Sequence, residues 1–199
     1  MPEILWRIQS PHIYLTFDDG PDPLITPELL RLLCRRNARA TFFLVGEKVA
    51  LYPNVVKKIL DAGHVVGNHS YSHPTLLGKK EDFVRQEVER TDDIIAVLSG
   101  NSPKLFRPPY GRFGKALLNV LKETKHRMVL WNASTKDYQS ESSAETISDS
   151  LLKSCKPGKI ILLHDGHANS FNTLQALQKS LPELLDRGIT FSSIPEFDS

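Results

Sequence analysis

The chain alternates between short apolar runs and longer segments with helical periodicity. The short runs are rich in β-branched and aromatic residues, which is typical of buried strands. They lie at residues 12–17, 40–45, 64–68, 105–107, 128–132, 159–164 and 190–191. The longer segments repeat apolar residues every three or four positions, the spacing of one helix face. They lie at residues 26–36, 54–62, 80–98, 115–125, 143–155 and 172–186.

Local signals support these boundaries. Thr26 followed by Pro27 predicts a helix N-cap and a first helical turn. Gly63 and Gly188 follow predicted helices, at positions where glycine commonly ends them. Strands that alternate with helices predict an α/β fold with a mostly parallel sheet. About seven strands could close into a barrel or form an open, doubly wound sheet, and periodicity does not choose between them.

Composition excludes several functional classes. The 199 residues are 40% hydrophobic and 24% charged, which is typical of a globular protein and argues against disorder. A formal net charge of +2 does not favour a nucleic-acid partner. The longest apolar runs, such as residues 160–163, are far too short to span a membrane. Without an internal repeat or a Gly/Ser linker, residues 1–199 are expected to form a single domain.

The N-terminus and the cysteines bear on the compartment. A signal peptide begins with a basic stretch followed by an apolar stretch, and the first residues of this chain do not show this pattern. The chain as written therefore fits a cytoplasmic protein, or an exported one from which a leader was removed. Cys34 and Cys155 lie among apolar neighbours in predicted helices, and no C-x-x-C pair exists. Two buried free thiols are expected, rather than a disulfide scaffold or a thiolate zinc site.

Reactive side chains follow the predicted strands. Because the carboxyl ends of parallel strands meet at one edge, such residues come together there. The strand-end residues are Asp18 and Asp19 after the first strand, His69 and His73 after the third, Arg107 at the fourth, Asp137 after the fifth and His164 at the sixth. Their convergence favours an active site.

The adjacent carboxylates Asp18 and Asp19 need a change of chain direction to share a site. Neighbouring residues in a strand point to opposite faces, and Gly20-Pro21 supplies a turn that would take the chain out of the strand. One carboxylate could then bind a cation while the other works as a base. The alternative is a turn or helix cap, because Asp-Gly is a common turn dipeptide.

The histidines divide into two groups. His69 and His73 are four residues apart, so on one helical turn they could chelate one metal ion, although two unrelated loop histidines are the alternative. With an Asp they would complete a three-ligand set that leaves open positions. His164 suits a general acid at the rim of a cleft, with a core histidine as the alternative. The remaining histidines receive no catalytic role: His12, His64 and His126 lie near strand starts, and His167 is unassigned.

Together these motifs resemble the NodB-homology polysaccharide deacetylases, carbohydrate esterase family four. The resemblance is carried by Thr-Phe-Asp-Asp-Gly-Pro at 16–21, His-Ser-Tyr-Ser-His at 69–73, Arg-Pro-Pro-Tyr-Gly at 107–111 and Leu-Leu-His at 162–164. Their order and spacing also agree, and the resemblance spans the chain from about residue 12 to 191. It implies a distorted (β/α) barrel with about seven parallel strands.

The resemblance also implies roles for individual residues. Asp19, His69 and His73 would hold one divalent metal ion, usually zinc, with Co²⁺, Ni²⁺ and Mn²⁺ as alternatives. Asp18 would be the general base and His164 the general acid. Arg107 would orient Asp18, and Asp137 would pair with His164. The backbone N–H of Tyr110 would complete the oxyanion hole, and Leu162 would line the acetyl pocket.

The fourth motif departs from the family pattern. The family commonly has Asp-x-x-Asp-Trp, whereas residues 134–138 read Ser-Thr-Lys-Asp-Tyr. Asp137 is kept, but Ser134 replaces the first Asp and Tyr138 replaces the Trp. Because that aromatic ring forms part of the pocket wall, Tyr138 is expected to contact substrate together with Tyr110 and Leu162. The departure puts substrate preference in doubt more than chemistry.

The resemblance therefore predicts a metal-dependent hydrolase that removes N-acetyl groups from a glycan and releases acetate. The substrate would be peptidoglycan or a chitin-like polymer of N-acetylglucosamine. One alternative is O-deacetylation of acetylated xylan, which needs no other residues. Another is a carbohydrate-binding homologue that has lost catalysis, against which the intact Asp18, Asp19 and His164 argue. The sequence indicates no oligomeric state.

Overall fold

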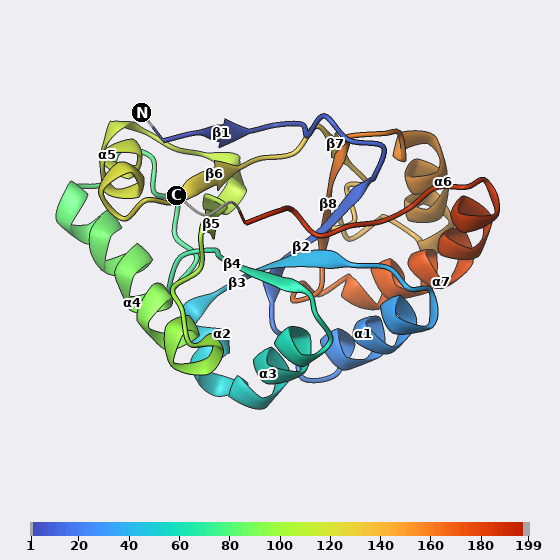
Figure 1. Cartoon of the computed structure of the whole chain (residues 1–199), viewed down its shortest axis with the longest axis horizontal. Coiled ribbons are helices and arrows are strands. Elements are labelled where there is room, and N and C mark those ends of the chain that lie inside the picture. The colour runs from blue at the N-terminus through green and yellow to red at the C-terminus, as the bar shows by residue number, and fades with distance from the viewer. Residues whose placement is uncertain (1, 197–199) are drawn as a thin grey trace.

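A curled parallel sheet forms the centre of the molecule, and helices cover its outer face (Figure 1). The structure, a computed structural model, describes residues 2–196. The strands are β1 Ile4–Leu5, β2 Tyr14–Gly20, β3 Ala40–Leu44, β4 Val65–Asn68, β5 Leu105–Phe106, β6 Arg127–Val129, β7 Ala133–Ser134 and β8 Ile160–His164. Their order in the sheet is β1-β6-β5-β4-β3-β2-β8-β7, and each neighbouring pair is parallel.

The helices follow the strands in the alternation that the sequence predicts. They are α1 Ile25–Arg35, α2 Gly46–Leu51, α3 Pro53–Asp61, α4 Glu81–Ser99, α5 Lys115–Glu123, α6 Ala144–Ser154 and α7 Ser170–Asp186, with a 3₁₀ turn at Pro109–Gly111. The predicted α/β fold with a distorted barrel is confirmed. Within the described residues, no ladder joins the end strands β1 and β7, so the barrel is incompletely closed.

Several short elements differ from the predictions. The described residues form a sheet of eight strands instead of about seven. Strands β1 and β7, of two residues each, were not predicted. Residues 190–191 form no strand; Phe191 makes an isolated bridge to Ile13. The six-residue helix α2 was not predicted. Elements of this length contain too few residues to show a period, and their long-range partners determine them.

The prediction of a helix cap at Thr26 is wrong. Helix α1 begins at Ile25, and Thr26 is fully buried inside its first turn. The Thr26 hydroxyl accepts a hydrogen bond from the Asp22 N–H and donates one to the buried carboxyl of Asp165. Gly63 and Gly188 do end their helices as predicted, with φ of 73° and 77° in the left-handed region that favours glycine.

The cysteine prediction is half right. Cys155 is buried just after α6, and burial raises the pKa of its thiol to about 12. Cys34 is exposed on α1, although its neighbours in sequence are apolar. A free cysteine packs as a small hydrophobic residue, but the helix face on which it lies decides whether it is buried.

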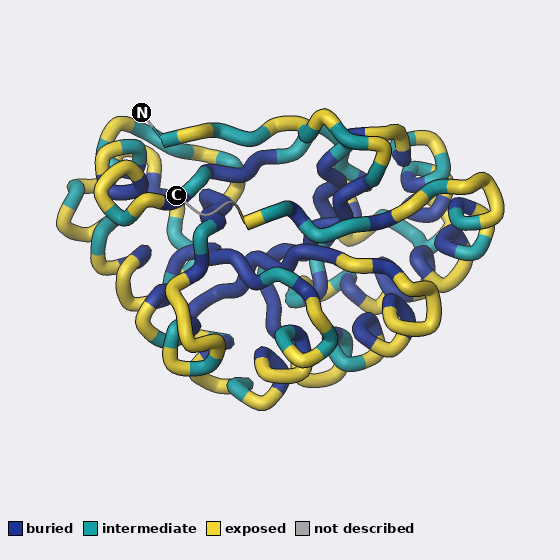
Figure 2. Tube along the Cα trace, in the orientation of Figure 1, coloured by how far each residue is buried: buried dark blue, intermediate teal, exposed yellow. Residues whose placement is uncertain are grey.

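The buried apolar side chains of the described residues form three clusters, which together cover both faces of the sheet. Figure 2 shows the central strands as largely buried, whereas the helices are exposed on their outward sides. Phe17 and Phe42 stack at 5.1 Å in the part between the sheet and the helices. Tyr14, Phe43 and Ile160 belong to a second cluster inside the barrel. Coverage of both faces explains why the strands read as continuous apolar runs.

Strand alternation then directs polar side chains toward the end of the barrel interior. Tyr14 faces the interior, so Thr16 and Asp18 share that face at successive levels along β2. On β8, Ile160 faces the interior, so His164 lies on the same face two levels further along. None of the described helices is both long and apolar enough for a membrane span.

The position of Phe42 predicts a large effect on stability. Phe42 is fully buried and contacts the rings of Phe17 and His64. Phe42→Ala should lower the free energy of unfolding by about 3–5 kcal/mol, because a cavity remains between sheet and helices. Val97, 84% exposed on α4, is the control. Val97→Ala should stay within about 0.5 kcal/mol of the parent chain.

Urea denaturation measures both changes, provided that the free energy of unfolding falls with urea concentration at the same slope in each variant and in the parent chain. A loss below about 1 kcal/mol for Phe42→Ala would contradict the proposed packing, because it would mean that the ring lies in a loosely filled region.

Candidate active site

The carboxyl ends of the strands enclose a pocket of about 300 Å³. It is lined by Asp18, Asp19, His69, His73, Tyr110, Arg112, Trp131, Tyr138, Leu162, His164 and His167. All the predicted ligand and substrate residues are therefore brought together. Two other predicted residues, Arg107 and Asp137, are buried and contact lining residues from behind.

A β-bulge at Asp19 turns both carboxylates toward the pocket. Asp18 pairs with Phe43 and Gly20 with Leu44, so Asp19 is an extra residue in β2. Its φ of 68° lies in the left-handed region. The strand therefore continues to Gly20, contrary to the expectation that the chain leaves it before the turn. The bulge re-aims the side chain, as bulges beside active sites do.

The segment from His69 to His73 is not the helical turn that the sequence suggested. It contains bends, and Ser70 and His73 have φ values of 64° and 56°. The Asn68 side chain accepts a hydrogen bond from the Ser70 N–H at 2.7 Å. The two histidines nevertheless approach each other, with ring centroids 4.9 Å apart. The two histidines are therefore neighbours in the structure, and a loop, not a helical turn, places them.

Glu87 of α4 holds the centre of this loop. Its carboxylate accepts hydrogen bonds from the backbone N–H groups of Tyr71 and Ser72 at 2.9 and 2.8 Å. It also accepts one from the Ser72 hydroxyl at 2.8 Å. The side chain of Glu87 is almost fully buried by these contacts. A helix that lies later in the sequence therefore fixes the backbone between the two histidines.

Asp19, His69 and His73 fit a divalent cation. Their ligand atoms lie within 4.8 Å of one another. The His69 Nδ1 lies 2.6 Å from the Arg107 carbonyl oxygen and must donate to it, which leaves Nε2 with a lone pair. That Nε2 lies 3.5 Å from Asp19 Oδ1, and the Nε2 of His73 lies 3.0 Å from the same oxygen. Electron-pair donors that converge in this way match a three-ligand metal set.

The electrostatics of Asp19 agree with this set. Burial acts to raise the pKa of its carboxyl, but without a cation the hydrogen bonds and positive charge of protonated His69 and His73 lower it more. The pKa of Asp19 therefore lies well below its usual range, and the carboxylate is ionised at any working pH.

Asp18 forms a buried ion pair with Arg107. Its Oδ1 accepts a hydrogen bond from the guanidinium at 2.7 Å, and its Oδ2 lies 3.6 Å from His69 Nε2. Arg107 is completely buried and also donates to the Thr16 hydroxyl and to two backbone carbonyls. Burial lowers the pKa of Arg107 and Asp18 raises it, with a net lowering. The guanidinium stays charged in a protein interior.

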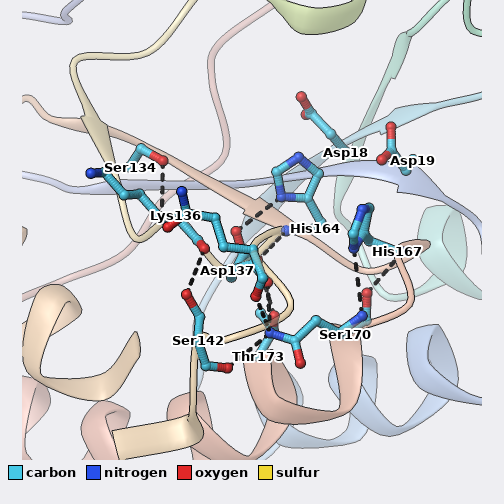
Figure 3. Close-up of polar contacts among 12 residues, drawn as sticks. Asp18, Asp19, Ser134, Lys136, Asp137, Ser142, His164, His167, Ser170 and Thr173 are labelled. Carbon is cyan, nitrogen blue, oxygen red and sulfur yellow. Dashed lines mark hydrogen bonds and ion pairs between the residues drawn. The ribbon is translucent and has the colours of Figure 1, made fainter. Parts of the chain in front are cut away.

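His164 and Asp137 form a second pair directly beside Asp18, because His164 is the register partner of Asp18 on the neighbouring strand β8 (Figure 3). The His164 Nδ1 lies 2.9 Å from Asp137 Oδ1, and the His164 backbone N–H donates to Oδ2 at 2.7 Å. Thr173 also donates to Oδ2. Burial acts to lower the pKa of His164, but Asp137, with the charges of Asp18 and Asp19, raises it to about 9. His164 is therefore protonated at neutral pH.

Aromatic and apolar side chains complete the pocket. Leu162 is buried in its lining, on the strand face that also carries His164. Tyr110 has a φ of 59°, and its ring lies 4.8 Å from that of His73. The Tyr138 ring lies 5.5 Å from that of His164. Ser134 is outside this lining, and its hydroxyl accepts the Lys136 N–H instead.

Sequence reasoning missed several lining residues. Arg112, Trp131 and His167 contribute to the pocket, and the His167 ring lies 5.9 Å from that of His164. Each follows a strand end, which is the signal that identified the other residues. His64 and His126 are buried outside the pocket, as expected, and burial together with Arg39 lowers the pKa of His64 to about 4.

A further buried carboxyl, Asp165, lies directly after His164. Burial raises its pKa to about 7, although the Thr26 hydroxyl and the charge of Lys48 act in the opposite direction. Asp165 was not among the predicted site residues.

Comparison with known proteins agrees with this geometry. The family model described as polysaccharide deacetylase matches residues 8–129. The chain is 41% identical over 186 residues to a peptidoglycan-N-acetylglucosamine deacetylase of Bacillus cereus, and the match covers 92% of this chain and 66% of that relative. It is 36% identical over 198 residues to a chitooligosaccharide deacetylase of Sinorhizobium fredii, covering 94% of this chain and 92% of the relative.

Solved structures of relatives superpose closely. A peptidoglycan N-acetylglucosamine deacetylase in complex with an N-hydroxybenzamide derivative gives a TM-score of 0.91 at 38% identity, over 98% of this chain and 92% of that one. A CE4 family pseudoenzyme from Bacillus anthracis gives a TM-score of 0.88 at 25% identity, over 98% of this chain and 68% of that one. Fold, strand-end residues and family model agree: this chain belongs to the polysaccharide deacetylase family.

Proposed function

We propose that the chain is a metal-dependent N-deacetylase that acts on N-acetylglucosamine units of peptidoglycan or of a chitin-like polymer. One observation carries the proposal. A base held by Arg107 and an acid held by Asp137 line the same pocket as a three-residue set for a divalent cation. The names of the relatives from Bacillus cereus and Sinorhizobium fredii support the choice of glycan.

Hydrolysis of an amide needs help at three points, since an amide is a poor electrophile with a poor leaving group. A divalent cation at Asp19, His69 and His73, with zinc as the first choice, would polarise the carbonyl and acidify water. Asp18 accepts the proton of the attacking water, and the hydrogen bond from Arg107 orients this carboxylate.

The departing amine receives its proton from His164, on the neighbouring strand β8. His164 is protonated before reaction and gives its proton to the leaving nitrogen, while Asp137 fixes the ring. The backbone N–H of Tyr110 donates to the developing oxyanion. A base and an acid each typically contribute about 10²–10⁴-fold in rate, and an oxyanion donor about 10²–10³-fold.

The lining suits a sugar that carries an acetyl group. Leu162 offers an apolar surface to the methyl group, and Tyr110, Trp131 and Tyr138 offer flat rings to sugar faces. The fold alone does not establish activity, because a CE4 family pseudoenzyme has a similar one. The complete acid, base and ligand set in this chain argues for catalysis over simple carbohydrate binding.

The first test of the proposed function is acetate release with zinc present. Peptidoglycan and chitooligosaccharides should release acetate faster than acetylated xylan, which reports O-deacetylation. The control is the chain treated with a chelator, which should lose activity because the cation polarises the carbonyl. Faster release from acetylated xylan would instead favour the esterase alternative. No release from any of the substrates would favour the inactive homologue.

A second prediction separates the two adjacent carboxylates. Asp18→Asn should lower turnover by about 10²–10⁴-fold while zinc stays bound, because it removes the base and no ligand. Replacing a residue that only hydrogen-bonds to a metal ligand typically weakens metal binding by roughly 10–100-fold. Asp19→Ala removes a ligand itself, so it should weaken zinc binding by more than that. Equilibrium dialysis against zinc, with acetate release in parallel, measures both. Equal zinc loss in the two variants would show that their roles are misassigned.

A third prediction concerns the pH dependence of kcat/KM. An essential acid loses activity as pH rises through its pKa, so His164 should set the alkaline limb. A bound cation would offset the negative charges of Asp18 and Asp19, which contribute to the raised pKa of His164. The alkaline limb should therefore have its midpoint between pH values of about 6.5 and about 9. Asp137→Asn removes the carboxylate that favours the imidazolium, and the limb should move by about 1–3 units toward acid.

The matched control for this shift is Thr173→Val, which removes one hydrogen bond to Asp137 and keeps the charge. Its alkaline limb should move less than that of Asp137→Asn. If Asp137→Asn kept the alkaline limb of the parent chain, a group other than His164 would be the acid.

A further inference from the structure

The short helix α2 contacts the segments that carry the metal-ligand set. It begins at Gly46, directly after β3. The backbone N–H groups of Gly46 and Glu47 donate to the carbonyls of Ser70 and Tyr71, both at 3.0 Å. These two carbonyls lie between His69 and His73. The first turn of α2 thus supports the loop that carries both histidines.

A lysine in the same turn reaches the other side of the site. Lys48 Nζ donates to the carbonyl oxygens of Asp19 and Gly166, each at 2.7 Å. Asp19 belongs to the bulge of β2, and Gly166 follows His164 and Asp165 in the loop after β8. One half-buried ammonium group therefore joins the segment of a metal ligand to the segment of the proposed acid.

The two joined segments are in unusually close contact. A Cβ built on Gly166 would lie 1.8 Å from the Asp19 carbonyl oxygen, so only glycine permits this approach. The Asp19 backbone is also held in the left-handed region, which a residue other than glycine keeps only when its surroundings enforce it. The two partly buried carbonyl oxygens converge on one point, and the donor between them satisfies both acceptors.

We propose that Lys48 is a positioning residue that holds the Asp19 bulge in its ligand geometry and ties it to the loop after His164. An ammonium group suits this role because it is a compact charge with several donors that can serve both carbonyls. Without it, the Asp19 backbone is free to relax from its left-handed conformation, and Oδ1 moves relative to the two histidines. This inference rests on the metal set of the proposed function.

The test compares three variants of the whole chain. Lys48→Met keeps a long side chain and removes the donor, and Lys48→Arg keeps a cation that can bridge two carbonyls. Lys57→Met, at an exposed position of α3, is the control. Zinc affinity is measured by competition with a chromophoric chelator, and ligand geometry by the visible absorption spectrum after loading with Co²⁺. Thermal unfolding without metal reports stability.

We expect zinc affinity about 10–100-fold weaker in Lys48→Met, as for other partners that orient metal ligands. The Co²⁺ spectrum of Lys48→Met should also change. Lys48→Arg should recover most of the zinc affinity, and Lys57→Met should match the parent chain in both zinc affinity and Co²⁺ spectrum. An affinity within about twofold of the parent and an unchanged spectrum in Lys48→Met would overturn the proposal. So would a loss that Lys48→Arg fails to recover and that parallels a fall in thermal stability.

The measurement on the parent chain separates the two levels of inference. If the parent binds neither zinc nor Co²⁺, the metal set of the proposed function fails, and the role of Lys48 toward that set falls with it. If the parent binds zinc and Lys48→Met binds it equally well, the role of Lys48 alone fails.

Discussion

The Arg107 guanidinium is completely buried in the barrel interior, and Asp18 provides the carboxylate that balances its charge. An unpaired charge there would cost several kcal/mol, so the two groups have to remain together. Arg107 also donates to Thr16 and to the carbonyls of Val129 and Leu130. The pair therefore connects β2 to the end of β6 and the residue that follows it.

The residues of the site could be predicted from the sequence far better than their conformations. Asp18, Asp19, His69 and His73 were identified because strand ends converge, which depends only on the alternation of strands and helices. Strand β2 was expected to end before Gly20 but runs through the bulge at Asp19, and the predicted helical turn at residues 69–73 was wrong. In each case the backbone adopts left-handed conformations that long-range contacts hold, and no local pattern encodes those contacts.

The same reasoning explains which parts of the fold were missed. Strand β1 pairs through Ile4 with Met128, and β7 pairs through Ser134 with Leu162, so their partners lie far away in the sequence. Strands of two residues cannot show an alternating pattern. The long helices and the central strands were predicted because each contains enough residues to show its period. Cys34 and Thr26 were misplaced because a local motif does not reveal which face of α1 is covered.

Two neighbouring strands of the barrel carry polar pairs with opposite tasks. On β2, the guanidinium of Arg107 orients Asp18 to accept a proton. On β8, Asp137 favours the protonated form of His164, so that group can give one. Both partners are almost fully buried, which prevents water from screening them. A CE4 family pseudoenzyme has a similar fold, so the barrel alone does not make a deacetylase, and the proposed activity of this chain depends on its polar side chains.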